Sequence, residues 1–279
     1  MPPAKKSLGQ NFLASPDVAR KIADALHPSP GDLIFEIGPG RGALTMPLAR
    51  SGATIVAYEI DEALVRFLEE QCGDLTNVEI HHADIRTVDF DAAAGERGAA
   101  TYKIAGNIPY NLTSTILIDL ARRRLCARAV FMVQKEVGDR ILASPGERKC
   151  GILSIFLQSY FIIGRVIGVR PGSFTPPPKV ESVVLAFTPG SSMTGPQERE
   201  SYLAFVKDVF LHRRKKLRNI LGEVIGGRGA GRHSGTEGAK TLEQLASLSG
   251  VDFDLRPEAL GLDSWFRLFA AITRVKGAR

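Results

Sequence analysis

The residues that say most about chemistry are four consecutive ones, Asn107-Ile108-Pro109-Tyr110. An exocyclic amine on a nucleic-acid base is a weak nucleophile because its lone pair is delocalised into the ring. A side-chain amide oxygen and a backbone carbonyl can each accept one of its N–H groups, which favours a pyramidal nitrogen with a free lone pair. Asn107 and the Ile108 carbonyl could act in this way. The tetrapeptide therefore predicts methylation of an amine, and the alternative is an ordinary Asn-x-Pro turn.

Neighbouring residues are suited to hold both the carbonyl and the base. Pro109 restricts its own φ angle and biases Ile108 toward extended geometry, which would keep the Ile108 carbonyl in place. Tyr110 offers a ring on which a base can stack. We predict that Phe174 holds the other face of an extruded base, and the alternative is that Phe174 belongs to the core of a hairpin. Extrusion costs a few kcal/mol and stacking returns about 1–3 kcal/mol per base, so two rings could roughly offset it.

The elements that must position these residues alternate between strands and helices. Five short apolar runs predict strands over residues 33–37, 54–58, 78–80, 102–105 and 129–133. Helical patterns lie between them, and Asp61 is a plausible cap for the helix after the second strand. This order predicts an α/β fold with a doubly wound, mostly parallel sheet. Residues 161–167 and 183–187 read as strands joined without a helix, so this pair should be antiparallel.

Polar residues follow four of the predicted strands. In a doubly wound sheet, ligands bind outside the carboxyl ends of the strands. The first strand ends in the glycine-rich loop Glu36-Ile-Gly-Pro-Gly-Arg-Gly42, and Glu59 follows Gly38 at the interval typical of a carboxylate that binds ribose hydroxyls. Asp84 could accept from an adenine amino group, and Asn107 ends the fourth strand.

Together these positions predict a site for a donor of the S-adenosylmethionine kind. Taken singly, the glycine loop could be a tight turn, Glu59 a surface acid and Asp84 a helix cap. A nicotinamide dehydrogenase is disfavoured because the G-x-G-x-G spacing differs from the G-x-G-x-x-G of dinucleotide sites.

Composition sets the class of protein and excludes others. The chain has 279 residues, of which 44% are apolar and 24% are charged, enough for a large domain or a medium and a small one. No apolar stretch approaches the ~20 residues that span a bilayer, and the first residues lack the apolar core of a signal peptide. We therefore expect a cytoplasmic protein that contacts no membrane. The three cysteines lack metal-ligand spacing, and adjacent His81 and His82 would face opposite ways on a strand, so no metal is expected.

A change in composition after residue 187 predicts a domain boundary. Residues 188–197 are rich in Pro, Gly and Ser and read as a linker. We expect a catalytic domain over residues 1–190 and a helical domain over residues 191–279. In the second domain, helices are predicted near 198–211, 213–222, 240–249 and 263–274, and residues 226–235 read as a glycine-rich loop.

Positive charge is concentrated in the second of these domains. The net charge of the chain is +6, and residues 191–279 carry 15 Lys and Arg against 10 Asp and Glu. Five of these cations fall within six residues: Arg213, Arg214, Lys215, Lys216 and Arg218. On a helix they would spread around the circumference instead of pairing with acids, so we predict contact with RNA or DNA phosphates, against the alternative of a solvated helix face.

The ordered motifs of the chain resemble one known family, the small-subunit ribosomal RNA adenine N6,N6-dimethyltransferases, over nearly the whole length. The motifs are Leu8-Gly-Gln-Asn-Phe-Leu13, Glu36-Ile-Gly-Pro-Gly-Arg-Gly42, Gly106-Asn-Ile-Pro-Tyr-Asn111, Val133-Gln-Lys-Glu-Val137, Phe174-Thr-Pro-Pro-Pro-Lys-Val-Glu-Ser182 and Arg213-Arg-Lys-Lys-Leu-Arg-Asn219. The resemblance implies a Rossmann-like class I methyltransferase fold with an antiparallel last strand and a small helical C-terminal domain.

The resemblance also implies a reaction, a donor and a substrate. The reaction would be dimethylation of two adjacent adenosines in a hairpin loop near the 3′ end of small-subunit ribosomal RNA, coupled to assembly of that subunit. The partner would be a precursor of the small subunit, and we expect a monomer. The donor, S-adenosylmethionine, would be contacted by Asn11, Leu13, Gly38, Gly40, Glu59, Ile60, Asp84, Ile85 and Asn107.

Some residues depart from the family, and two other functions stay open. Cys150-Gly151 stands where the family often has Tyr-Gly, and His212 and Lys216 stand where Gln and Thr are common. These departures concern RNA contacts more than the chemistry. A macrolide-resistance methyltransferase of large-subunit RNA shares several motifs, but the Phe174–Lys179 segment and the C-terminal pattern favour the small subunit. A non-catalytic ribosome-assembly or transcription factor on the same scaffold is disfavoured by the intact donor motifs.

Overall fold

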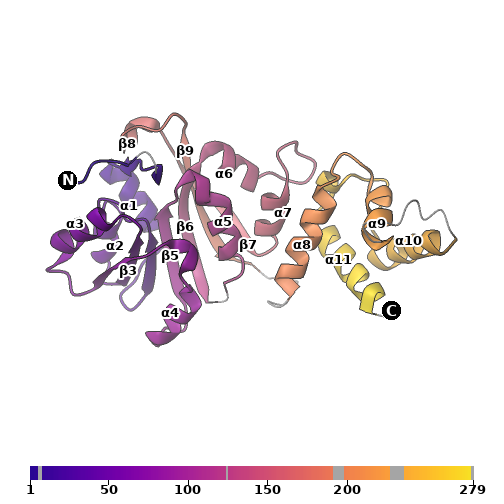
Figure 1. Ribbon diagram of the computed structural model, residues 1–279, viewed down its shortest axis with the longest axis horizontal. Helices are drawn as coiled ribbons and strands as arrows, with labels where there is room; N and C mark the ends of the chain where they lie inside the picture. Colours follow the sequence, from indigo (N-terminus) through magenta and orange to yellow (C-terminus); the bar gives the residue numbers. More distant parts are fainter. Residues whose placement is uncertain (6–7, 124, 191–197, 227–235, 278–279) are drawn as a thin grey trace. The chain divides into compact units, whose positions relative to one another are not determined.

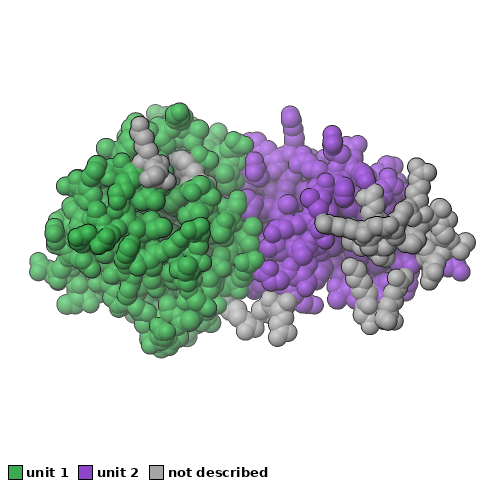
Figure 2. Space-filling view, viewed as in Figure 1, with its two compact units in different colours: residues 1–139, 161–190 green, residues 140–160, 191–279 purple. Residues whose placement is uncertain are grey.

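The computed structural model describes residues 1–5, 8–123, 125–190, 198–226 and 236–277, and the chain forms two compact units (Figure 2). The first unit comprises Met1–Asp139 and Phe161–Gly190, and the second comprises Arg140–Tyr160 and Ser191–Arg279. The chain passes from the first unit to the second after Gly190, where the composition predicts a domain boundary. Residues 140–160, however, group with the C-terminal helices, which the sequence does not predict. The linker residues 191–197 and most of the glycine-rich loop lie outside the described residues.

A seven-stranded sheet forms the centre of the first unit, in the order β4-β3-β2-β5-β6-β9-β7 (Figure 1). Its strands are β2 (Leu33–Ile37), β3 (Thr54–Glu59), β4 (Val78–His82), β5 (Tyr102–Asn107), β6 (Cys126–Gln134), β7 (Phe161–Val169) and β9 (Ser182–Pro189). The first five of these strands are parallel in the sheet, whereas β9 runs antiparallel to both β6 and β7. The predicted mostly parallel sheet and its antiparallel last strand are therefore confirmed.

Helices connect the strands and cover the sheet. They are α1 (Pro16–Ala25), α2 (Thr45–Ala49), α3 (Glu62–Cys72), α4 (Phe90–Glu96), α5 (Thr113–Leu120) and α6 (Lys135–Ile141). The last two residues of α6 belong to the second unit. Asp61 caps α3 as predicted, since its side chain accepts from the Ala63 amide at 3.1 Å. Helices α1 and α4 are not among the elements predicted from the sequence. A second, two-stranded sheet pairs β1 (Phe12–Leu13) antiparallel with β8 (Phe174–Thr175).

The core of the first unit has two layers because successive strand residues face opposite sides of the sheet. On one side, Ile34 belongs to a cluster with Ile22 of α1. On the other side, the Phe35 ring lies 5.1 Å from the rings of Phe90 and Tyr102, measured between centroids. The β2 strand is buried along its whole length, and the glycine loop follows directly at its carboxyl end.

The second unit is helical. It contains α7 (Ile152–Gln158), α8 (Arg199–Phe210), α9 (Leu217–Gly226), α10 (Thr236–Ser249) and α11 (Leu262–Gly277). Aromatic side chains form its core: Trp265 stacks on Phe210 with centroids 5.5 Å apart, and Tyr202 stacks on Phe266 at 5.0 Å. The predicted helix 213–222 is wrong at its start, because α9 begins only at Leu217.

One glycine of the sheet is required by close packing. A Cβ atom at Gly106 of β5 would lie 2.7 Å from the Ile37 carbonyl oxygen and 3.0 Å from the Ile37 Cβ. We expect Gly106→Ala to lower the free energy of unfolding by about 1–3 kcal/mol, because the paired strands must shift. Urea denaturation measures this. Gly164→Ala on β7 is the control, since no atom lies within 4 Å of its added Cβ; equal losses in both variants would contradict the packing argument.

Candidate active site

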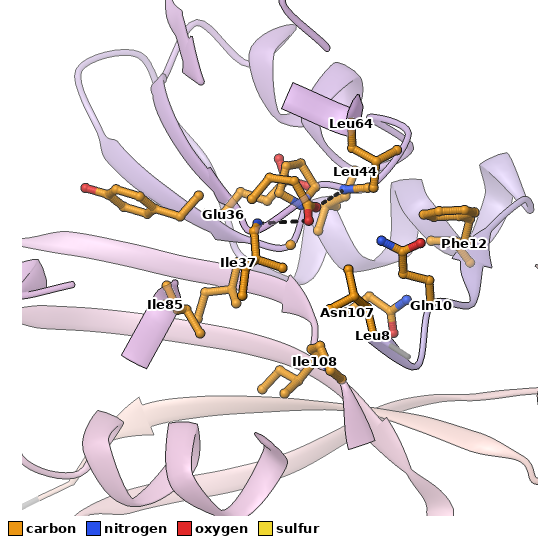
Figure 3. Close-up of a pocket in the computed structure, with 18 of the residues that line it drawn as sticks. Leu8, Gln10, Phe12, Glu36, Ile37, Leu44, Leu64, Ile85, Asn107 and Ile108 are labelled. Carbon is orange, nitrogen blue, oxygen red and sulfur yellow. Dashed lines mark hydrogen bonds between the residues drawn. The ribbon is translucent and has the colours of Figure 1, made fainter. Parts of the chain in front are cut away.

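A pocket at the carboxyl ends of β2, β3 and β5 brings together the residues predicted to bind the donor (Figure 3). Ile108 and Pro109 line the same pocket. The predicted donor residues in its lining are Asn11, Leu13, Gly38, Gly40, Glu59, Ile60, Asp84, Ile85 and Asn107. The structure thus gathers segments up to 96 residues apart, as the Asn11–Asn107 contact shows. Their individual contacts with a donor stay predictions.

The glycine loop between β2 and α2 has backbone geometry that favours glycine. Gly38, Gly40 and Gly42 have φ angles of +64°, +59° and +80°. A Cβ at Gly40 would also lie 3.0 Å from a ring carbon of Phe12. The loop can therefore turn tightly and present backbone N–H groups at the pocket.

Glu59 ends β3 inside the pocket, where backbone donors orient it. Its Oε2 accepts from the Gly40 amide at 3.1 Å, and its Oε1 accepts from the amides of Ile60 and Asp61 at 3.0 Å each. Burial raises the pKa of this carboxyl, and the three hydrogen bonds counteract that rise. Because Oε2 accepts only one of these bonds, it keeps capacity for a further donor such as a ribose hydroxyl.

Asp84 both lines the pocket and caps a short helix. Its Oδ1 accepts from the Arg86 amide at 3.0 Å, and both carboxylate oxygens accept from Arg86 Nε at 3.0 Å. The Arg86 hydrogen bonds hold the pKa of Asp84 below its ordinary value. The cap and the predicted donor contact are thus compatible, but a bound adenine amino group would share this carboxylate with Arg86.

Asn107 has a defined orientation at the end of β5. Its Nδ2 donates to the Asn11 carbonyl at 3.0 Å. Since a carbonyl only accepts, the NH2 group must face Asn11, and Oδ1 is left to accept from another group. Ile108 lies just beyond the end of β5, and its amide donates to the Met132 carbonyl of β6 at 3.2 Å. Acceptance of a target amine by Asn107 Oδ1 and the Ile108 carbonyl stays a prediction.

Of the two aromatic residues predicted to clamp the base, the structure describes the side chain of Phe174 alone, and Phe174 does not line the pocket. Phe174 is 4% exposed, lies opposite Leu13 in the β1–β8 pair and packs in the hydrophobic core. Its ring offers no free face to a base in this conformation, so the alternative of a core residue describes it here. Tyr110 begins a 3-10 turn, and its side chain lies outside the part of the chain described in side-chain detail.

Several pocket residues were not predicted, and two of them carry buried polar atoms without a partner. Glu36 Oε2 and Arg41 Nε have no hydrogen-bond partner among the described residues. Both residues line the pocket, together with Tyr58 and Leu112. The sequence signal for Glu36 is a single acid within the apolar strand Leu33–Ile37. Together with the remaining acceptor capacity of Glu59 Oε2 and the Asp84 carboxylate, these unsatisfied polar atoms fit the polar and charged groups of S-adenosylmethionine.

Burial also makes Glu36 a proton-binding group near neutral pH. Burial raises its pKa from 4.5 to about 8, so the folded protein holds this proton where the unfolded chain has released it. The stability linked to the proton is complete below the unfolded pKa and is lost as the pH rises through 8. We expect Glu36→Gln to remove up to about 1.4 kcal/mol per pH unit from the fall of unfolding free energy between pH 5 and 8. Urea titrations at four pH values test this against exposed Glu62→Gln; the same slope in wild type and Glu36→Gln would contradict it.

The basic residues of the second unit differ from the predicted arrangement. Residues 213–216 lie in the turn between α8 and α9 instead of on a helix. The cluster is also largely paired: Arg213 lies 3.5 Å from Glu258, and Lys216 and Arg218 lie 3.0 and 2.5 Å from Asp254. Acids distant in sequence, which periodicity cannot reveal, supply these partners. Arg214 is exposed and has no ion pair with any described residue.

The described residues contain neither a cluster of metal ligands nor a helix that could cross a membrane. Within the described ranges, no group of three or more His, Cys, Asp and Glu side chains is arranged to hold a metal ion. The described helices include none that is long and apolar enough to cross a bilayer. His81 lies 3.3 Å from Glu79, and His82 contacts the Ile60 carbonyl at 3.0 Å.

The fold and the pocket together define a class I S-adenosylmethionine-dependent methyltransferase. Among solved structures, a dimethyladenosine transferase from Plasmodium falciparum is similar with a TM-score of 0.79 and 24% identity, over 94% of this chain and 98% of that chain. The 23S rRNA methyltransferase ErmE is similar with a TM-score of 0.70 and 23% identity, over 94% of this chain and 100% of that chain. At these identities the likeness shows the fold.

Sequence comparison gives the family. The family model described as ribosomal RNA adenine dimethylase matches residues 1–248. A ribosomal RNA small subunit methyltransferase A from Geobacter metallireducens is 43% identical over 97% of this chain and 94% of that protein. The one from Geobacter sulfurreducens is 39% identical with the same coverage. The chain belongs to the ribosomal RNA adenine dimethylase family, and it is an enzyme that methylates ribosomal RNA adenines with S-adenosylmethionine as donor, as the motifs predicted.

Proposed function

We propose that this enzyme dimethylates N6 of two adjacent adenosines in a hairpin loop near the 3′ end of small-subunit ribosomal RNA. The observation that carries the proposal is the orientation of Asn107, whose Nδ2 donates to the Asn11 carbonyl among the residues of the donor pocket, so that its Oδ1 can accept from an amine. Relatives named ribosomal RNA small subunit methyltransferase A, alignable over 97% of the chain, support the choice of subunit.

Residues at the end of β5 perform the positioning in this proposal. Asn107 Oδ1 and the Ile108 carbonyl each accept one N–H of the adenine amino group, so that its lone pair points at the donor. S-adenosylmethionine supplies a methyl group on a sulfonium centre. Tyr110 stacks on the extruded base. No strong general base is needed, because the amine becomes acidic as soon as it is methylated and cationic.

The donor is held in this proposal by three features of the pocket. Glu59 accepts the ribose hydroxyls, and Asp84 accepts from the adenine amino group beside Arg86. The glycine loop gives the donor close access to the backbone at Gly38 and Gly40. We place Asn11, Leu13, Ile60 and Ile85 around the same molecule because all of them line the pocket.

The helical second unit would hold the RNA. We propose that the turn between α8 and α9 contacts phosphates through Arg213, Arg214, Lys215, Lys216 and Arg218. Arg214 is the most available of these cations, since Arg213, Lys216 and Arg218 are paired with acids. We further propose a cytoplasmic monomer that acts on a precursor of the small subunit.

Labelled methyl transfer to purified particles tests the choice of substrate. The protein is incubated with labelled donor and either small or large ribosomal subunits, each taken from cells that lack the corresponding adenine methylation. We expect label in small-subunit RNA alone. Label confined to large-subunit RNA would support the macrolide-resistance type of activity, and donor binding without transfer to either particle would support an assembly factor.

A further inference from the structure

The first residues of the chain connect the donor pocket to Asn107. Residues 1–5 and 8–14, here called the N-terminal strap, supply six of the residues that line the pocket. The strap reaches the catalytic amide at Asn11, whose carbonyl accepts from Asn107 Nδ2 at 3.0 Å. It reaches the loop after Glu59 at Asp61, which binds Lys5 and Gln10.

Asp61 is the centre of this second contact. Its side chain is fully buried, and its Oδ1 accepts from Lys5 Nζ at 2.7 Å while its Oδ2 accepts from Gln10 Nε2 at 3.0 Å. Burial alone would raise the pKa of this carboxyl, but the donors from Lys5, Gln10 and the Ala63 amide lower it overall. Asp61 is therefore ionised at neutral pH, and hydrogen bonds from a charged partner are stronger than neutral ones.

A separate contact keeps the strap on the protein even without Asp61. The Arg41 guanidinium lies 4.3 Å from the centre of the Phe12 ring, and its Nη2 donates to the Pro2 carbonyl at 2.8 Å. The β1–β8 pairing anchors the end of the strap as well. Loss of the Asp61 contacts should therefore loosen the strap between its anchors and leave the first unit folded.

The position of the strap matters because the Asn107 side chain ends in two different groups, an oxygen that accepts and an NH2 group that donates. With the NH2 group on the Asn11 carbonyl, Oδ1 is available to accept from an amine. If the Asn11 carbonyl moves away, the amide is free to turn and present its NH2 group, which cannot accept. The Asn11 carbonyl thus selects the productive orientation of Asn107.

We propose that Asp61 is a positioning residue for methyl transfer. By holding Lys5 and Gln10, it fixes the Asn11 carbonyl and, through that carbonyl, the orientation of the Asn107 amide. The effect on catalysis rests on the proposed role of Asn107, whereas the effect on the Asn107 amide does not.

The first experiment observes the amide itself. In protein labelled with 15N-asparagine, hydrogen exchange of the Asn107 side-chain amide is compared in wild type, Asp61→Asn and the double variant Lys5→Met/Gln10→Met. Asparagine keeps the helix-cap acceptor but loses the charge. We expect exchange to become about fivefold faster or more, as for loss of one hydrogen bond. Arg66→Met is the matched control, because it removes an ion pair from the same helix, the one with Glu62 at 3.0 Å, without touching the strap.

The second experiment measures single-turnover methyl transfer to small-subunit particles at saturating donor. We expect a loss of about tenfold or more in both strap variants, because small misplacement of a catalytic group is costly, and no loss in Arg66→Met. Unchanged exchange and unchanged transfer in Lys5→Met/Gln10→Met would overturn the proposal, and this variant decides if Asp61→Asn fails to fold. Absence of transfer by the wild type would instead refute the proposed function, and the exchange experiment would still decide the role of the strap.

Discussion

Replacing Asn107 with alanine is expected to nearly abolish methyl transfer while the protein still binds its donor. The variant removes the oxygen that accepts from the target amine, and loss of one such preorganised group typically costs about 10²–10³ in rate. Donor affinity should fall by no more than about tenfold, since one neutral hydrogen bond is worth about 0.5–1.5 kcal/mol. Single-turnover transfer and a donor-binding titration measure the two quantities separately.

The thermal stability of the Asn107→Ala protein serves as the control for this prediction. The Asn107 side chain bonds to the Asn11 carbonyl, so its loss also frees the N-terminal strap at that point. A large drop in melting temperature would mean that lost activity reflects lost structure. Undiminished transfer by a folded Asn107→Ala protein would remove Asn107 from the mechanism.

Neutralising the turn between α8 and α9 is expected to weaken RNA binding and flatten its salt dependence. Each lost phosphate contact should reduce the slope of log K against log salt by about 0.7–0.9, because fewer counterions are released. The triple variant Arg213→Ala/Arg214→Ala/Lys215→Ala should therefore bind RNA with a clearly shallower slope. Binding measured at several salt concentrations gives this slope directly.

The ion pairs of the second unit refine this prediction. Arg214 is exposed and forms no ion pair with a described residue, whereas Lys216 lies 3.0 Å from Asp254. Arg214→Ala should therefore change the slope more than Lys216→Ala, because Lys216 must give up its acid before it binds a phosphate. An unchanged slope in the triple variant would place the RNA surface elsewhere.

Local signals account for the parts of the fold and site that the sequence predicts. Each strand that precedes Gly38, Glu59, Asp84 or Asn107 can be predicted from only a few residues. Because these strands are parallel, their carboxyl ends lie at the same edge of the sheet. The donor pocket follows from that rule. Helix α1 had such a signal too, in the Ser15-Pro16 start, since Ser15 accepts from the Val18 amide at 3.4 Å.

The remaining features depend on contacts between distant segments. Gln10 and Asp61 are 51 residues apart, and the local sequence around either residue does not predict their hydrogen bond. Lys216 pairs with Asp254, which lies 38 residues further along the chain. The basic cluster of residues 213–218 therefore looks unpaired when only the neighbouring sequence is considered. Phe174 is followed by three prolines, a pattern that suggests an exposed loop, but its pairing with β1 buries the ring. Such tertiary pairings override what local composition indicates.

The most direct test of the central claim is to map the modified bases by mass spectrometry. Small subunits from cells lacking the modification are incubated with the protein and donor, and RNA fragments from the 3′ end are sequenced by mass. The proposed function predicts two adjacent adenosines that each gain two methyl groups on N6, and no such gain with Asn107→Ala. Unmodified small-subunit RNA, or methylation at another base or atom, would contradict it.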